Sequence, residues 1–153
     1  MVSTKSKWFC EESLGKYNAP DIEKAKDYLS KSSYDGSPLV FITTKDNAYM
    51  YKTALALSDM VKPAGIVIDI QVYDNATLKD YRMDPDKFDM FSSGLSEKVD
   101  PTQIAFFEDG WAGFYKSEKK DELMAKMNAE SDFNKRYEYW EEMCKVLYED
   151  LPI

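Results

Sequence analysis

Between residues 20 and 93, apolar positions recur in two alternating rhythms. A spacing of about 3.6 residues is typical of an amphipathic helix, and alternation or a short continuous apolar run is typical of a strand. The helical rhythm covers residues 20–31, 47–62 and 76–82. The strand rhythm covers residues 38–44, 66–73 and 88–93. Strands separated by helices predict crossover connections, and therefore an α/β fold with a mainly parallel sheet and helices on both faces.

The second of these strands shows the clearest alternation. Its polar residues Asp69 and Gln71 face away from four apolar residues, namely Ile66, Ile68, Ile70 and Val72. The pattern predicts one well-buried face.

Three further helices are expected toward the end of the chain. The first runs over residues 101–107, after the pair Asp100-Pro101, and the next two begin after Ser117 and Ser131, which are good capping residues. Residues 1–16 show little periodicity, and we expect them to be a lead-in segment. Residues 17–153 are then predicted to form a single α/β domain.

Composition narrows the classes of function. The 153 residues carry 20 Lys and Arg against 28 Asp and Glu, a net charge of −8, so a basic surface for nucleic acid is not expected. No apolar run is long enough to span or insert into a membrane. The chain has no histidine, which removes imidazole acid–base chemistry and imidazole metal sites. The first residues lack the apolar stretch of a signal peptide, which by itself predicts a cytoplasmic chain.

The chain has two cysteines, Cys10 and Cys144. Two separately placed free thiols are the interpretation we favour from spacing, and a single long-range disulfide is the alternative.

In a parallel α/β sheet, ligands bind beyond the carboxyl ends of the strands. Thr43 and Thr44 end the first strand just before a helix, where hydroxyls and a helix start favour an anionic or carbonyl group; a simply capped helix is the alternative. Residues 92–100 follow the third strand and combine serines with a glycine, which lets a ligand approach backbone N–H groups. Glu97 in this loop could pair with an ammonium group. The alternative is an exposed connection between a strand and a helix.

Two other groups of residues were weighed for chemistry. Trp111 and Tyr115 could stack on a ligand or plug the edge of the sheet. Neighbouring carboxylates could form the acidic pair of a hydrolase, but with 28 acidic residues such neighbours arise freely. We therefore expect no catalytic residue, no metal site and no cofactor.

The order of several segments resembles a known family. The matching pieces are residues 20–29, 39–44, 54–60, 64–66, 69–72, 86–94, 100–101, 129–136 and 146–152. Together they resemble the C-terminal lobe of the family 5 extracellular solute-binding proteins, the peptide, opine and nickel receptors of ABC importers. The resemblance covers residues 17–153 and implies one lobe of a type II periplasmic-binding-protein-like receptor.

This resemblance implies a function without catalysis. The chain would be one lobe of the substrate-binding component of an ABC-type importer for peptides or similar small polar solutes, and the ligand would be held as two lobes close. The implied partners are a small-molecule or peptide ligand, the N-terminal lobe of the same receptor, from which residues 1–16 would lead in, and the membrane permease. The parent protein would lie outside the cytoplasm, in the periplasm or at the cell surface. The alternatives are a stand-alone cytoplasmic interaction domain and a carboxylate-based hydrolase.

The ligand residues of the family transfer only partly. Peptide-binding relatives carry a Gly-Trp pair after the third strand and then an Asp that holds the peptide ammonium; here these positions are Gly94, Leu95 and Lys98. Either Glu97 substitutes for that Asp, or the ligand has no ammonium group. The expected ligand contacts are Thr43, Thr44, Ser92, Ser93, Gly94, Leu95, Ser96, Glu97, Lys98 and Trp111.

Overall fold

The computed structural model describes residues 3–10, 20–96 and 98–152 and divides the chain into two compact units. The sheet unit is Pro20–Gly94, and the helical unit combines Met1–Ala19 with Leu95–Ile153. The division falls between Gly94 and Leu95, inside the loop that was expected to carry ligand contacts.

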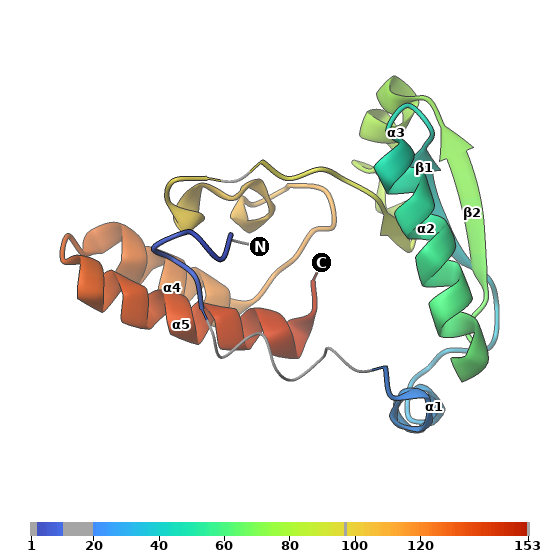
Figure 1. The fold of residues 1–153 in the computed structure, drawn as a ribbon, viewed down its shortest axis with the longest axis horizontal. Helices are drawn as coiled ribbons and strands as arrows, with labels where there is room; N and C mark the ends of the chain where they lie inside the picture. Colours follow the sequence, from blue (N-terminus) through green and yellow to red (C-terminus); the bar gives the residue numbers. More distant parts are fainter. Residues whose placement is uncertain (1–2, 11–19, 97, 153) are drawn as a thin grey trace. The chain divides into compact units, whose positions relative to one another are not determined.

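The sheet unit contains a three-stranded parallel sheet in the order β2-β1-β3 (Figure 1). The central strand β1 (Leu39–Thr44) pairs along its whole length with β2 (Ile68–Tyr73). On its other side it pairs with β3 (Met90–Phe91) through Phe41 and Ile42. The expectation of a mixed α/β fold with a parallel sheet is therefore confirmed.

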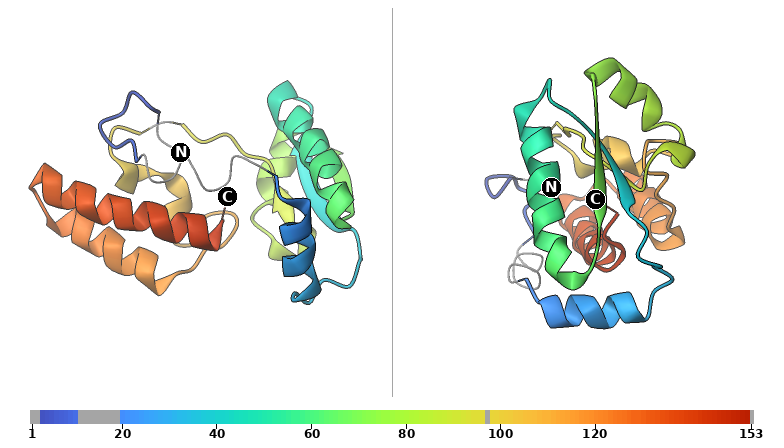
Figure 2. Two further views of the ribbon diagram at one scale, coloured as in Figure 1. Left: turned by 60° about the horizontal axis from the view of Figure 1, so that its bottom comes forward. Right: turned by 90° about the vertical axis from the view of Figure 1, so that its right-hand side faces the viewer.

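One helix precedes β1 and two connect the strands, and each begins after a residue that caps its free N–H groups. The helices α1 (Ile22–Ser30), α2 (Ala48–Val61) and α3 (Asn75–Tyr81) are capped by the side chains of Asp21, Asn47 and Asp74. Short 3₁₀ turns follow α2 at Lys62–Ala64 and precede β3 at Pro85–Lys87. Figure 2 shows α2 along one face of the sheet, where it packs against β1 and β2.

Two strand predictions need correction. The third strand was expected over residues 88–93 but contains Met90–Phe91 alone. One reason is that the Asp89 carboxylate accepts the Val40 N–H at 2.7 Å, a bond that a strand carbonyl would otherwise accept. The apolar face of β2 was expected to be well buried, yet Val72 is 40% exposed. Alternation shows which residues share a face, but it does not show whether another element covers that face.

The helical unit has two long helices after two short turns. The helix expected over residues 101–107 is instead a pair of 3₁₀ turns, Pro101–Gln103 and Ala105–Phe107, separated by the extended backbone of Ile104. The helices α4 (Glu118–Ala129) and α5 (Phe133–Asp150) pack on each other.

Both long helices of this unit begin at a capping side chain. Ser117 caps α4 as predicted. Asp132 caps α5 in place of Ser131, because the Asp132 carboxylate accepts the Lys135 N–H at 3.0 Å.

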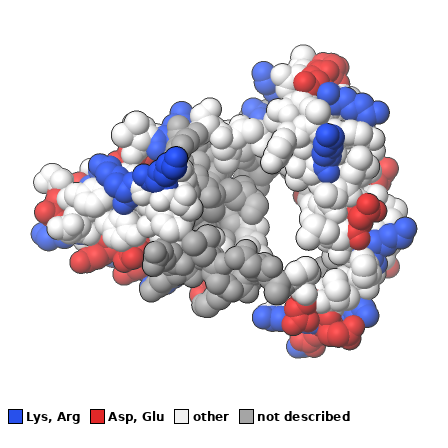
Figure 3. Space-filling model, viewed as in Figure 1, with Lys and Arg blue, Asp and Glu red and all other residues white. Residues whose placement is uncertain are grey.

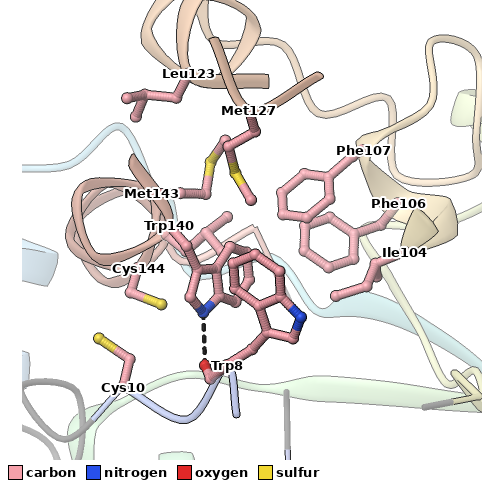
Figure 4. Close-up of a cluster of buried hydrophobic side chains, with 11 residues drawn as sticks. Trp8, Cys10, Ile104, Phe106, Phe107, Leu123, Met127, Trp140, Met143 and Cys144 are labelled. Atoms are coloured by element: carbon pink, nitrogen blue, oxygen red, sulfur yellow. Dashed lines mark hydrogen bonds between the residues drawn. The ribbon is translucent and has the colours of Figure 1, made fainter. Parts of the chain in front are cut away.

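The start of the chain contributes to the core of the helical unit (Figure 4). Trp8 and Cys10 are almost fully buried there, against side chains of α5. The Trp140 Nε1 donates to the Trp8 carbonyl at 2.8 Å, and the Tyr137 hydroxyl donates to the Phe9 carbonyl at 2.6 Å. Residues 3–10 are thus packed into the helical unit, which the weak periodicity of this segment did not predict.

Among the helices in the described ranges, none combines the length and the hydropathy that a bilayer span needs.

Candidate ligand-binding site

The carboxyl end of β1 is built from hydroxyl side chains that bond within the sheet unit. Thr43 and Thr44 are 0% exposed, and Ser92, just after β3, is 9% exposed. The Ser92 Oγ donates to the Thr43 Oγ1 at 2.5 Å, and the Thr44 Oγ1 accepts the Asp46 N–H at 3.1 Å. These three predicted ligand residues therefore form a buried polar layer where β1 and β3 end. The carboxyl ends of the strands together with this layer are called the polar edge below.

The loop after β1 is tied to its neighbours by acidic and amide side chains. The Asn47 side chain caps α2 by accepting the Tyr49 N–H at 3.0 Å. The Asp46 carboxylate accepts the Asn75 N–H at 2.8 Å, which joins this loop to the start of α3. The negatively charged Asp46 carboxylate thus lies beside the N-terminus of α2, which carries the positive end of the helix dipole. It weakens the attraction of this helix end for an anion.

Arg82 adds a permanent positive charge to this edge, and the sequence did not single it out. Arg82 follows α3 directly, and its Nη1 donates to the Ser93 Oγ at 3.1 Å. Both side chains are half-buried, so they bridge the buried polar layer and the surface. The guanidinium group stays charged and presents its N–H groups in a planar fork that fits a carboxylate. The sequence feature that could have marked Arg82 as a candidate site residue is the rarity of arginine, since the chain has two arginines, Arg82 and Arg136.

Gly94 ends the sheet unit at an exposed position. A Cβ added there would meet the Met50 Cε at 3.6 Å, which is an ordinary van der Waals contact. The backbone therefore does not require glycine at this point.

The remaining predicted contacts belong to the helical unit. Leu95 is 41% exposed, and Ser96 and Lys98 are also exposed. Glu97 lies outside the described residues. Trp111 is half-buried and packs against the core of the helical unit, and its role toward a ligand stays a prediction.

A surface pocket of the sheet unit lies away from this edge. It has a volume of about 580 Å³ and is lined by residues of the loop before β1, including Ser32, Tyr34 and Asp35, together with Ile66 and Asp89. Hydrogen bonds from the Ser37 backbone and side chain hold the pKa of Asp35 below its usual range. The pocket is at the amino end of β1, whereas the predicted ligand residues are at its carboxyl end.

Two acidic side chains of the sheet unit bond to nearby backbone N–H groups. The Asp84 carboxylate accepts the Asp86 N–H at 3.1 Å at the start of a 3₁₀ turn, and Asp89 bonds to β1. Over the ranges that the structure describes, no three acidic or cysteine side chains gather as metal ligands would. In the view of Figure 3, Lys and Arg lie among Asp and Glu on the sheet unit, without a surface of a single sign.

The chain is similar to proteins of one family. A family model described as "Bacterial extracellular solute-binding proteins, family 5 Middle" matches residues 1–121. No curated protein matches the chain in sequence.

Solved structures share the fold. NikA from Staphylococcus aureus, in complex with Ni(L-His)₂, is 25% identical with a TM-score of 0.79, and the match covers 98% of this chain and 33% of that chain. The oligopeptide-binding protein AppA from Bacillus subtilis, in complex with a nonapeptide, is 20% identical with a TM-score of 0.75, covering 98% of this chain and 34% of that one. A mannohexaose-bound periplasmic oligopeptide-binding protein from Thermotoga maritima is 19% identical with a TM-score of 0.74, covering 95% and 32%. The chain thus spans about a third of the length of these proteins.

Proposed function

The chain belongs to family 5 of the bacterial extracellular solute-binding proteins, and from this premise we propose that it is one ligand-binding lobe of the receptor of an ABC-type importer. The proposed ligands are peptides or similar small polar solutes. Affinity comes from closure against an N-terminal lobe of the same receptor, and no bond of the ligand is broken. The observation that carries this proposal is the family match over residues 1–121, joined to a polar edge at the carboxyl ends of the strands.

The polar edge has two layers under this proposal. Thr43, Thr44 and Ser92 form a rigid wall, because their hydroxyls bond within the unit. Ser93, which follows Ser92 in the chain, and Arg82 are half-buried and hydrogen-bonded to each other. A ligand carboxylate would gain charge-assisted bonds from Arg82, and backbone N–H groups near Gly94 would bind carbonyl groups.

The residues after Gly94 supply selectivity in this proposal. Glu97 and Lys98 discriminate between charged ligands, while Leu95, Ser96 and Trp111 provide mixed polar and apolar contact. Residues 17–153 act together as one lobe, the receptor works outside the cytoplasm, and the loaded receptor delivers its ligand to a membrane permease.

The test is a titration of the isotope-labelled chain with trialanine and with its C-terminal amide, followed by NMR. One lobe offers half of the contacts, so binding in the millimolar range is expected, with shifts at Ser93, Gly94 and Arg82. Arg82→Gln should weaken trialanine binding about tenfold and leave binding of the amide unchanged, since the amide has no carboxylate. Arg82→Lys keeps the positive charge but lacks the planar pair of N–H donors. Its affinity for trialanine should therefore fall between those of the unaltered chain and of Arg82→Gln.

Two outcomes count against the proposal. Shifts absent for both peptides at high concentration would contradict a peptide-binding lobe. Equal losses for trialanine and its amide in Arg82→Gln would remove the carboxylate role of Arg82 and leave the rest of the site standing.

A further inference from the structure

The two cysteines of the chain, one near each end of the sequence, meet in the core of the helical unit. Cys10 is 2% exposed and Cys144 is 7% exposed. Figure 4 shows their sulfur atoms pointing toward each other, Cys10 from the start of the chain and Cys144 from α5. Both cysteines are free thiols in this structure, as expected, but they lie side by side and are not separately placed.

The backbone around this pair is held in place by hydrogen bonds. The Trp8 and Phe9 carbonyls accept bonds from Trp140 and Tyr137, both on α5. Residues 137, 140 and 144 lie on one face of that helix, because three- and four-residue steps return to the same side. Cys10 thus follows two residues that are already bonded to the face on which Cys144 lies.

We propose that Cys10 and Cys144 form a disulfide that fastens residues 3–10 to α5. The pairing rests on the geometry of the helical unit alone, whereas the oxidising compartment in which it would form in the cell rests on the proposed function. A long-range cross-link of this kind restricts the unfolded chain and so stabilises the folded one.

The reaction is a thiol–disulfide exchange. The thiolate of one cysteine attacks a low-molecular-weight or protein disulfide, breaks its S–S bond, releases one of its sulfurs as a thiolate and stays joined to the other in a mixed disulfide. The thiolate of the other cysteine then breaks the mixed disulfide and releases the second sulfur of the oxidant as a thiolate. The two cysteines lose two protons and two electrons, and the oxidant gains them as two thiols. Burial, with the Cys10 thiol beside it, raises the pKa of the Cys144 thiol, so exchange is slow in the folded chain. Oxidation is expected while residues 3–10 are still detached from α5.

The test is refolding of the full chain from denaturant in a buffer of reduced and oxidised glutathione. The products are quenched with acid, denatured, alkylated and analysed by mass spectrometry. We expect a monomer that takes no alkyl group, has lost the mass of two hydrogen atoms, and yields one peptide pair linked through Cys10 and Cys144. Its excess over the mixed glutathione adduct should be at least about tenfold.

Matched samples make this test specific. The same chain treated with dithiothreitol should take two alkyl groups and should unfold at a midpoint lower by roughly 10 °C. Cys10→Ala and Cys144→Ala each retain one thiol and should show no such shift on reduction. If either variant fails to fold, the oxidised and reduced forms of the unaltered chain still give the comparison.

Three outcomes would overturn the disulfide. They are two alkylated cysteines after refolding, glutathione adducts as the main product, or disulfide-linked dimers. None of these readouts involves a ligand, so a failure of the receptor proposal leaves this result unaffected.

Discussion

The bond between Thr43 and Ser92 gives the sharpest test of how the polar edge is built. Thr43 is 0% exposed, and its Oγ1 accepts the Ser92 hydroxyl at 2.5 Å. Thr43→Val removes the acceptor with almost no change of shape. Ser92→Ala removes the donor, while the Ser92 backbone N–H keeps its 3.1 Å bond to the Ile42 carbonyl.

The size of the effect follows from burial. Each single substitution leaves the other hydroxyl in the interior without this partner, which destabilises a folded protein by about 1–3 kcal/mol. The double variant removes both hydroxyls and leaves neither one without its partner. Its loss should therefore be smaller than the sum of the two single losses by about 1–2 kcal/mol.

The assay is urea unfolding of the four chains of this double-mutant cycle, followed by far-ultraviolet circular dichroism. Ser96→Ala is the matched control, since its hydroxyl is exposed and its loss should stay within about 0.5 kcal/mol. Losses that add to within about 0.3 kcal/mol would refute the reasoning. Thr43 would then not depend on Ser92, and a direct ligand contact would become the better explanation for its hydroxyl.

Two further predictions concern the helical unit. Trp140→Phe removes the buried N–H that binds the Trp8 carbonyl and should lower the free energy of unfolding by about 2 kcal/mol in urea; no loss would show that residues 3–10 are held without this bond. Burial alone would raise the pKa of Asp100, but hydrogen bonds from Thr102 and from Arg136, whose Nη2 lies 2.8 Å from the Asp100 Oδ2, outweigh it and lower the pKa. This stabilisation is therefore present above about pH 4 and is lost as the pH falls through the lowered pKa of the folded chain. Asp100→Asn should make the thermal unfolding midpoint depend less steeply on pH between about pH 5 and pH 2. An unchanged slope would contradict the stabilising role of the Asp100 carboxylate.

The helix starts were predictable because the information is local. Asp21, Asn47, Asp74 and Ser117 each stand just before an apolar stripe, and their side chains accept N–H groups two or three residues ahead. Ser131 and Asp132 are adjacent and both can cap a helix, so the sequence alone did not separate them. The structure selects Asp132, one residue later than predicted.

The packing of residues 3–10 was not predictable in the same way. Eight residues are too few to show a period, and the partners of Trp8 and Cys10 are more than 90 residues away in the sequence. Their burial is decided by α5 and by the Val99 carbonyl, which accepts the Trp8 Nε1 at 3.0 Å. The side-by-side position of Cys10 and Cys144 follows from the same distant contacts, which spacing along the chain does not encode.

The orientation of single side chains in the candidate site also depends on residues that are distant in the sequence, and local pattern does not predict it. A cluster of hydroxyl residues correctly indicated the carboxyl ends of β1 and β3, but it did not indicate which hydroxyls face inward. Thr43 is fully buried and its hydroxyl bonds to Ser92, a partner 49 positions away. The adjacent Ser93 binds Arg82, which lies outside every loop that was expected to contact ligand. An edge already fixed by its own hydrogen bonds loses little conformational freedom when a ligand arrives. Selectivity in the proposed lobe should therefore depend less on Thr43 and Thr44 than on the half-buried Ser93 and Arg82 and on the residues after Gly94.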